Sequence, residues 1–420
     1  MVSENIHNKI LPQRQQVKLR NQWLAMRLEQ TLPQIMQETG IDLWIIVGRE
    51  FNEDPIMHSL FPAPFQNASR LTGLIFSLEN NGAVECLNMY SSQSGALQPY
   101  YKPVWDKGSE SQWECLGRIV RQKDPQRIGL NFSENVALVD GISSVLYQHV
   151  LDAIGPEYAR QVVSAEHLGV RWLETRLPEE LDAYPGINGI MDAVIDEMFS
   201  GATIHPGVTT TTDVEYHFID TIQKLGLSIN FKPDVDLQRR GRTETKIGDT
   251  LILPGDLLRC DVGLQYLGLN TDTQKMAYVL KQGEKSAPDG MRKALENCHK
   301  FQDIVCSNLR EGKTGNQVFA GSKQEAALAG IQADLYAHPI GFHVHGAGPI
   351  FGLWDQQGFI PGRGELPVHN NTCYALELFT RQYLPEWDQD INIFLEQVIA
   401  YHDDKVFYIG KREEQFLLIS

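Results

Sequence analysis

Residues 260–274, CDVGLQYLGLNTDTQ, place Asp261 and Asp272 in strand-like apolar text. The text predicts a hairpin that turns near Leu267 and Gly268, so the two carboxylates would lie roughly opposite each other. Two like charges in one apolar site repel, and one of them would have to take a proton. A divalent cation such as Mn²⁺, Mg²⁺, Co²⁺ or Zn²⁺ between them removes the repulsion. For the pair alone, two solvated residues on an open hairpin face are the simpler interpretation.

The C-terminal half adds further isolated polar groups. The stretch HPIGFHVHGAGP (338–349) holds three histidines among glycines and prolines, and TCYALELF (372–379) and INIFLEQVIAY (391–401) place Glu377 and Glu396 in apolar strands. An acid buried without compensation is costly, so each glutamate needs a partner, and a salt bridge is the simplest one. Two aspartates, a histidine and two glutamates together would make one oxygen-rich dinuclear metal site.

The order and spacing of these residues resemble the pita-bread metallopeptidases, which include Xaa-Pro aminopeptidase, prolidase, methionine aminopeptidase and the metal-free creatinase. PGDLLRCDVGLQYLGLNTD resembles the family's P-G-D-hydrophobic-D-x-G…G…D stretch. HPIGFHVH resembles its H-x-x-G-x-x-x-H stretch, and ALELF and FLEQVIAY resemble its two glutamate segments. The resemblance implies five metal ligands: Asp261, Asp272, His338, Glu377 and Glu396.

The same resemblance implies hydrolysis of an amide bond in small peptides, with two divalent ions of Mn, Co or Zn as cofactors. Two metal ions about 3.5–4 Å apart can hold a bridging water, lower its pKa and polarise a carbonyl group. Glu377 would carry the proton to the leaving nitrogen. His345 would face the substrate and donate a hydrogen bond to the tetrahedral oxyanion, with a purely structural role as its alternative. His343 is interpreted as a neighbour of the ligands or an exposed residue.

Three positions depart from the family pattern. The stretch QRRGRTETKIG (238–248) lacks the histidine that family peptidases usually carry upstream of the first aspartate. Asp272 is followed by Thr273, Gln274 and Lys275 instead of a hydrophobic residue, Thr or Ser, and Arg. Phe394 stands two residues before the last glutamate, where Xaa-Pro enzymes often have arginine. These departures put the Xaa-Pro specificity in question.

Three functions therefore stay open. The first is an Xaa-Pro-like aminopeptidase or dipeptidase. The second, favoured by the missing histidine and by Phe394, is a metal-dependent non-peptidase on the same fold, a lyase or amidohydrolase for a small metabolite. The third is a non-catalytic binding protein, against which the complete ligand set argues. Arg239, Arg240 and Arg242 could clamp a substrate carboxylate, although such a run is more often a solvated loop.

The bulk properties exclude other classes of partner. The chain has 420 residues, a net charge of −16 and a pI near 5.2, which argues against binding to nucleic acid or to an anionic membrane. No apolar run is long enough for a transmembrane helix, and the N-terminus has no apolar signal-peptide core, so a cytoplasmic protein is expected. The six cysteines form no C-x-x-C pair, which fits a reducing compartment.

Two domains must position the predicted ligands. Strands alternate with helices up to about residue 170, which predicts an α/β domain over 1–172 that resembles the creatinase-type N-terminal domain. Residues 173–420 are predicted to form an α+β pita-bread domain of two similar halves, each with two helices followed by strands. The resemblance also implies a homodimer. The main elements expected in the second domain are helices at 287–310 and 314–330 and strands at 338–350, 372–380 and 391–408.

Overall fold

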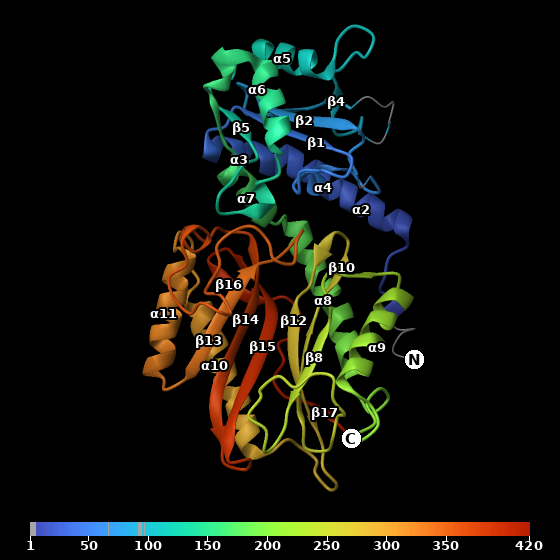
Figure 1. The fold of residues 1–420 in the computed structure, drawn as a ribbon, viewed down its shortest axis with the longest axis vertical. Helices are drawn as coiled ribbons and strands as arrows, with labels where there is room; N and C mark the ends of the chain where they lie inside the picture. The colour runs from blue at the N-terminus through green and yellow to red at the C-terminus, as the bar shows by residue number, and fades with distance from the viewer. Residues whose placement is uncertain (1–5, 66, 91–94, 96) are drawn as a thin grey trace. The chain divides into compact units, whose positions relative to one another are not determined.

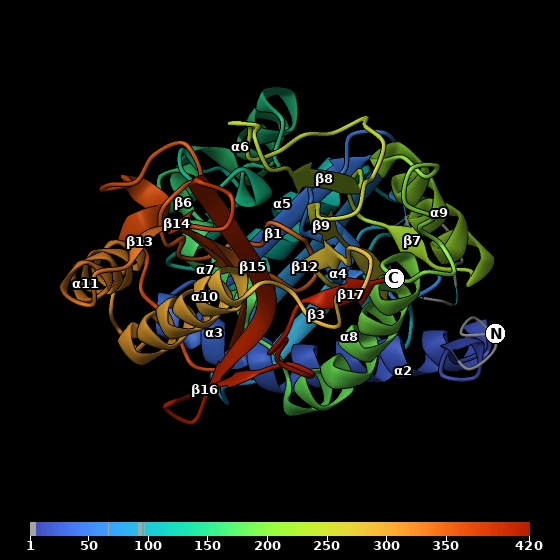
Figure 2. The same ribbon diagram turned by 90° about the horizontal axis from the view of Figure 1, so that it is seen from below.

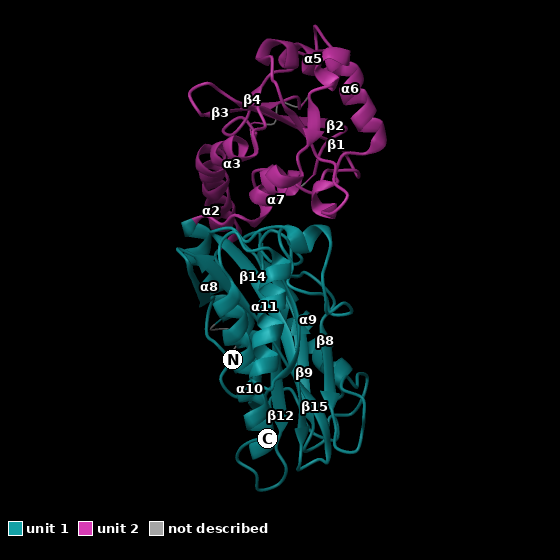
Figure 3. Cartoon of the chain, turned by 90° about the vertical axis from the view of Figure 1, so that its left-hand side faces the viewer, with its two compact units in different colours: residues 1–11, 178–420 teal, residues 12–177 magenta. Residues whose placement is uncertain are grey.

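A computed structural model of the chain describes residues 6–65, 67–90, 95 and 97–420. The chain divides into two units, residues 12–177 and residues 1–11 together with 178–420 (Figure 3). The boundary predicted from the sequence, after residue 172, falls within helix α7 (Glu166–Glu174), which belongs to the first of these units. The division into domains at that residue stays a prediction.

A mixed six-stranded sheet forms the centre of the unit over residues 12–177, with the strand order β4-β3-β2-β1-β5-β6. Strand β1 pairs antiparallel with β2 and parallel with β5, as expected for an α/β arrangement that begins with a hairpin. The chain begins this unit with three consecutive helical segments that end at Gly40, which adopts a left-handed conformation. The elements are α2 (Gln13–Met26), the π-helical η1 (Arg27–Thr31), α3 (Leu32–Thr39), β1 (Leu43–Arg49), α4 (Met57–Leu60), β2 (Leu71–Leu78), β3 (Val84–Asn88), β4 (Lys102–Pro103), α5 (Gln112–Lys123), β5 (Ile128–Leu130), η2 (Ala137–Val139), α6 (Ser144–Ala159), β6 (Val162–Ser164) and α7.

The core of this unit lies between the sheet and helices α5 and α6. Alternate side chains of β1, such as Leu43 and Ile45, pack against Ile119 of α5 and Val150 of α6. Ser111 starts α5 with a capping box, because its hydroxyl accepts the amide hydrogen of the third helical residue and that residue's carboxylate accepts the Ser111 amide hydrogen.

An eight-stranded, mainly antiparallel sheet forms the centre of the second unit. Its main path is β13-β14-β15-β12-β9-β8, with β16 added to β15 and β17 parallel to β12. A separate three-stranded sheet has the order β11-β10-β7. Figures 1 and 2 show the long strands β14 and β15 side by side at the centre of the unit. The strands are β7 (Ser228–Ile229), β8 (Asp234–Gln238), β9 (Leu257–Val262), β10 (Leu264–Tyr266), β11 (Leu269–Asn270), β12 (Thr273–Val279), β13 (Gln332–Pro339), β14 (Thr372–Leu384), β15 (Gln389–His402), β16 (Lys405–Tyr408) and β17 (Leu417–Ile419).

Helix pairs precede each group of strands, which confirms the predicted order of helix, helix and strands in both halves. The helices are α8 (Pro178–Met198), α9 (Thr211–Lys224), α10 (Asp289–Asn308), α11 (Gly315–Leu328) and the short 3₁₀ segment η3 (Gly362–Glu365). Thr210 and Thr314 cap α9 and α11 through capping boxes. Among the described residues, no helix is long and apolar enough to cross a membrane.

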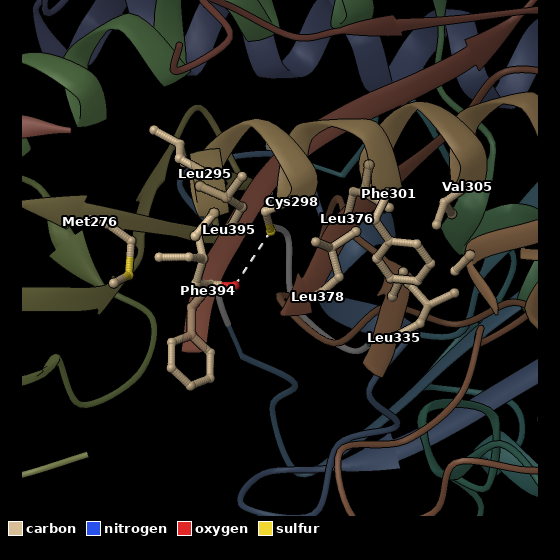
Figure 4. Close-up of a cluster of buried hydrophobic side chains, with 14 of the residues drawn as sticks. Met276, Leu295, Cys298, Phe301, Val305, Leu335, Leu376, Leu378, Phe394 and Leu395 are labelled. Carbon is tan, nitrogen blue, oxygen red and sulfur yellow. Dashed lines mark hydrogen bonds between the residues drawn. The ribbon is translucent and has the colours of Figure 1, made fainter. Parts of the chain in front are cut away.

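Side chains of β15 alternate between the two faces of the sheet. Leu395 points toward α10 and packs near Leu295 and Cys298, whereas Phe394 points to the opposite face (Figure 4). Because strand side chains repeat every two residues, Glu396 shares the face of Phe394. The helices α10 and α11 therefore cover one face of the sheet with an apolar core, and the predicted ligands lie on the other.

The predicted hairpin around the two aspartates is only partly confirmed. The turn at Leu267 and Gly268 is present, and both residues have positive φ. Asp261 pairs with Gln274, so Asp272 lies two residues from the position directly opposite Asp261, but ligand atoms of the two aspartates still lie within 4.8 Å of each other, as the predicted proximity of their carboxylates requires. The two-residue turn at Leu267 and Gly268 pairs Tyr266 with Leu269, and the same register continues from β10 and β11 to Val262 and Thr273, so it places Gln274 opposite Asp261.

The strand predicted over 338–350 is also wrong in extent. Strand β13 occupies Gln332–Pro339, and residues 340–361 form an irregular loop after it. Pro339 ends the ladder because residues beyond it bond across loops: the Gly346 amide donates to the Pro339 carbonyl at 2.7 Å. His343 and His345 are therefore loop residues.

Candidate metal centre

Strand register brings four polar side chains into one row across the second unit's sheet. Asp261 on β9 pairs with Gln274 on β12, Gln274 pairs with Glu396 on β15, and Glu396 pairs with Glu377 on β14. Paired residues of neighbouring strands project from the same face. The row continues to Tyr336 on β13, which pairs with Glu377. Asp261 and Glu396 are more than one hundred residues apart in the sequence, yet the sheet places both in this row, with Gln274 between them.

The remaining predicted ligands stand one step along the same face. His338 lies two residues after Tyr336 on β13, and Asp272 lies two residues before Gln274. Three overlapping groups each have ligand atoms within 4.8 Å of one another: Asp272, His338 and His345; His338, Glu377 and Glu396; and Asp261, Asp272 and Glu396. The structure thus brings together all five residues for which metal binding was predicted, and also His345.

His338 presents a lone pair to these carboxylates. Its Nδ1 lies 3.2 Å from the carbonyl oxygen of Pro339, which can only accept, so Nδ1 carries the proton and Nε2 is unprotonated. Nε2 lies 3.7 Å from Oδ2 of Asp272 and 3.8 Å from Oε1 of Glu396. Burial is the main cause that lowers the pKa of His338 to about 3, so the ring is neutral at physiological pH. A neutral imidazole oriented by a backbone carbonyl is the form in which histidine binds metals.

The carboxylates are held in an environment that disfavours their charge. Burial and then mutual repulsion raise the pKa of Asp272 and of Glu396 well above the ordinary range. Burial and the nearby Asp261 raise the pKa of Glu377 to about 7. The pKa of Asp261 is also raised, mainly by burial, although Arg259 opposes the shift. Such a group of acids needs a cation or protons to coexist in one site.

Three atoms at the centre of the cluster have no hydrogen-bond partner among the described residues. They are Oδ1 of Asp272, Nε2 of His338 and Oε1 of Glu396, and all three belong to side chains that are at most 4% exposed. A buried polar atom without a partner carries a desolvation cost of about 1–3 kcal/mol. Each of these atoms is an electron-pair donor, so a divalent cation would satisfy all of them at once. The donor set, carboxylate oxygens with one imidazole nitrogen, fits Mn²⁺, Co²⁺ or Zn²⁺.

In the sequence, Gln274 is one of the departures from the family pattern, and nothing there predicts that it binds the two glutamates. Its Nε2 donates to Oε1 of Glu377 at 2.8 Å and to Oε2 of Glu396 at 3.1 Å. A neutral amide thus ties one oxygen of each glutamate and leaves the other oxygens available. Its role depends on the pairing of β12 with β15, which the sequence does not show. Lys275, its neighbour, forms salt bridges with Asp192 and Glu413 at 2.8 and 3.0 Å.

His345 stands at the exposed side of the cluster. Its ring lies 4.6 Å from that of His338 in an edge-to-face arrangement. Partial burial and then the positive charge of Arg363 lower the pKa of His345. Arg363 also fixes the loop that carries His345, because its guanidinium donates to the carbonyl oxygens of Gly346 and Gly348 at 2.6 and 3.3 Å. A neutral histidine held beside the ligands can still donate a hydrogen bond from one ring nitrogen.

The arginine run upstream of β9 is engaged in local ion pairs. Arg239 donates to both carboxylate oxygens of Asp256 at 2.8 and 2.7 Å, and Arg242 pairs with Glu244 at 2.8 Å. Two of the three arginines are thereby occupied, which favours the structural interpretation over a substrate clamp. The same stretch holds Lys246, whose ammonium lies 5.1 Å from the ring centroid of Phe394.

Comparison with known proteins gives a family match for the chain and solved structures of similar fold. The model of metallopeptidase family M24 matches residues 187–403, and no curated protein matches the sequence. The solved X-Pro aminopeptidase from Thermotoga maritima MSB8 superposes with a TM-score of 0.67 at 16% identity, over 92% of this chain and 99% of that chain. The dipeptidase from Pyrococcus horikoshii OT3 gives 0.63 at 18% identity, over 94% and 100%. The Xaa-Pro dipeptidase from Bacillus anthracis gives 0.63 at 17%, over 94% and 99%.

These findings agree with the geometry of the site. The matched segment covers more than half of the 420 residues and includes Asp261, Asp272, His338, Glu377 and Glu396. The solved structures share the fold that the sequence predicted, an α/β unit followed by a pita-bread unit. The clustered acids and histidines fit the divalent-metal dependence of the family. The chain therefore belongs to metallopeptidase family M24 and is a metal-dependent peptidase.

Proposed function

We propose that this protein hydrolyses the amide bond of small Xaa-Pro-type peptides with two divalent metal ions. The observation that carries the proposal is the set of overlapping ligand groups in which Glu396 belongs both to the group with His338 and Glu377 and to the group with Asp261 and Asp272. A carboxylate shared between two groups is the arrangement in which two ions are bridged. The family match disfavours the non-peptidase and non-catalytic alternatives.

In this proposal the five clustered residues are the metal ligands. Glu377 and His345 also act on the peptide. The bound ions would supply an activated water and a Lewis acid for the scissile carbonyl. Glu377 carries a proton toward the leaving nitrogen, which is the role that the family resemblance implies for it. His345, on the exposed side of the cluster, donates a hydrogen bond to the oxyanion of the tetrahedral intermediate.

Glu377→Gln tests the proton-carrying role. The change keeps the shape of the side chain but removes its basic oxygen, so kcat for an Xaa-Pro dipeptide is expected to fall by about 10²–10⁴. Steady-state kinetics with saturating Mn²⁺ measure the effect. Glu284→Gln is a matched control, since Glu284 accepts hydrogen bonds from Tyr278 and Lys281 away from the cluster. Turnover of Glu377→Gln equal to that of the control would show that Glu377 is no proton carrier.

We propose that Lys246 binds the free C-terminal carboxylate of a short substrate. It is exposed, it forms no salt bridge within the described part of the chain, and its charge acts on the nearby Asp261 and Glu377. It also stands in the stretch that lacks the expected histidine. An exposed cation beside a metal-binding cluster would attract the negative end of a dipeptide.

Lys246→Met is therefore expected to raise KM for Xaa-Pro dipeptides by about tenfold, which corresponds to the loss of one charge-assisted hydrogen bond. The value of kcat should change little. The C-terminally amidated substrate provides the control, since it has no carboxylate and should respond weakly to the substitution. Equal increases in KM for the acid and the amide would exclude the carboxylate grip.

The overall proposal is tested by assaying the purified protein on a panel of peptides. Xaa-Pro dipeptides, longer Xaa-Pro peptides and matched Xaa-Ala peptides are incubated with the ion-stripped protein and with added Mn²⁺, Co²⁺ or Zn²⁺, of which we propose Mn²⁺ as the physiological ion. Metal-dependent release of the residue before proline, with little cleavage of the Xaa-Ala peptides, is the expected result. Bound metal without cleavage of any peptide in the panel would overturn the proposed specificity.

We also propose that the protein acts in the cytoplasm as a homodimer. The support is the net charge of −16, the cysteines that form no disulfide in the structure, and the resemblance to family members noted above. Light scattering coupled to size exclusion measures the mass in solution against 47.4 kDa for one chain. A mass of one chain at micromolar concentration would contradict the dimer.

A further inference from the structure

Arg259 on β9 is buried beside the cluster and contacts three carboxylates. The residue is 1% exposed. Its Nη1 donates to Oδ2 of Asp261 at 3.0 Å, and its Nη2 donates to Asp236 and Asp234 at 2.6 and 2.7 Å. Asp261 is the only one of the three that belongs to a group able to hold a metal ion within the described residues. Arg259 therefore links a buried acidic framework to a predicted metal ligand.

The other side of this guanidinium lies against Phe394. The central carbon of the guanidinium is 5.3 Å from the centroid of the Phe394 ring, within the range of cation–π contacts. Phe394 stands two residues before Glu396 on β15, at the position where Xaa-Pro enzymes often have arginine. The structure thus shows a guanidinium at this place, delivered by β9 instead of β15.

The contacts fix how Asp261 can bind an ion. Oδ2 of Asp261 accepts a hydrogen bond from Arg259, and Asp261 also has a ligand atom within 4.8 Å of ligand atoms of Asp272 and Glu396, so the arginine holds this carboxylate beside the cluster. Two further aspartates hold the guanidinium, so it cannot follow Asp261 if that side chain moves. Interactions that orient a metal ligand in this way typically change metal affinity by about 10- to 100-fold when removed.

We propose that Arg259 is the positioning residue for the metal-binding carboxylate of Asp261, and that it takes from β9 the place of an arginine at position 394. The inference rests on the proposed function only in treating Asp261 as a metal ligand. The inference predicts that Asp261 can be positioned by a guanidinium from either β9 or β15. Without any guanidinium, the carboxylate should lose its position.

The test compares Arg259→Gln with the double variant Arg259→Gln/Phe394→Arg. Isothermal titration of the ion-stripped proteins with Mn²⁺ is expected to show at least a tenfold weaker binding step in the single variant. The double variant should recover most of that loss. The side chain of residue 394 lies beside the guanidinium of Arg259, so an arginine at this position can place its own guanidinium in the same region. Arg239→Gln is the matched control: it removes a comparable bidentate pair, with Asp256, outside the cluster, and should leave the titration unchanged.

Loss of folding is separated from loss of positioning by a second variant. Arg259→Lys keeps the positive charge among Asp234, Asp236 and Asp261 but cannot bond several carboxylates in a fixed plane, so it should fold and still bind Mn²⁺ more weakly. Thermal unfolding of the ion-stripped proteins verifies the folding.

The possible results distinguish this inference from the proposed function. Mn²⁺ binding by Arg259→Gln and Arg259→Lys that equals the wild type would overturn the inference alone. A double variant no better than Arg259→Gln would overturn the interchange of strands. Mn²⁺ binding with the expected pattern, but without peptide cleavage by the wild type, would overturn the peptidase specificity and leave the positioning role supported. A wild type that binds no Mn²⁺ would overturn both.

Discussion

Glu396→Gln is expected to abolish Mn²⁺ binding at both positions and to reduce Xaa-Pro turnover to background. Glu396, like Asp272, belongs to two of the three ligand groups, and it is 1% exposed. An amide has no charge to balance a divalent ion and offers one weaker donor oxygen, so neither group remains complete. Removal of a shared ligand should therefore cost more than the loss of a residue that belongs to one group, such as Asp261.

The same substitution should make the ion-free protein more stable. Without ions, Glu396 must take up a proton when the chain folds, because burial and then the nearby Asp272 and Glu377 raise its pKa well above the ordinary range. A neutral amide of the same shape needs no proton, and its gain in stability is on the order of 1–3 kcal/mol near neutral pH. Metal-free melting temperatures should rise, whereas the stabilisation by added Mn²⁺ should disappear.

Two measurements verify this prediction. Isothermal titration follows ion binding, and thermal unfolding with and without Mn²⁺ follows stability. Glu284→Gln, outside the cluster, is the control and should behave as the wild type in both. Undiminished Mn²⁺ binding by Glu396→Gln would show that Glu396 is not a shared ligand. A lower melting temperature of the ion-free variant would show that Glu396 is compensated by contacts other than an ion.

The ligand residues could be predicted from the sequence because burial makes them conspicuous. Glu377 and Glu396 are single acids in the mainly apolar stretches TCYALELF and INIFLEQVIAY, and such acids demand partners whatever the details of the fold. The helices α10 and α11 were located to within a few residues, because Thr314 and the apolar spacing mark their limits. Patterns that depend on one strand or one helix were thus readable.

Features that depend on pairing between distant strands were not readable. The direct opposition of Asp261 and Asp272 failed because the register set by the turn at Leu267 and Gly268 pairs Asp261 with Gln274, two residues beyond Asp272. Gln274 and Arg259 were missed for the same reason. Their partners lie on other strands, and only the register shows that an amide sits between two glutamates and a guanidinium lies on Phe394.

The ion-free protein is also expected to lose stability as the pH rises from about 6.5 to 8.5. Burial raises the pKa of Asp272 and Glu396 well above the ordinary range and that of Glu377 to about 7. A carboxyl with a raised pKa binds more protons in the folded than in the unfolded chain. Its contribution to stability is complete below the unfolded pKa and is lost as the pH rises through the folded pKa.

His338 and His345 act in the opposite direction, but over a different range. Their pKa values are lowered, chiefly by burial, so their contribution is present above the unfolded histidine pKa and is lost as the pH falls. Above about pH 6.5 an unfolded histidine is already mostly neutral, so the histidines change little. The carboxyl groups alone then set the sign, and each proton released on unfolding accounts for about 1.4 kcal/mol per pH unit.

Bound Mn²⁺ should reverse this dependence, because ions bind the deprotonated ligands and bind more tightly as the pH rises. Denaturant unfolding at pH 6.5, 7.5 and 8.5, with a chelator or with saturating Mn²⁺, measures both slopes. Glu174, in the other unit, has a pKa raised by burial to about 7 and shifts stability in the same direction as the cluster. Glu174→Gln therefore removes that contribution, while Glu396→Gln removes part of the cluster's. If chelator and Mn²⁺ gave the same slope in the Glu174→Gln protein, the clustered carboxyl groups would not be the ones that hold the ions.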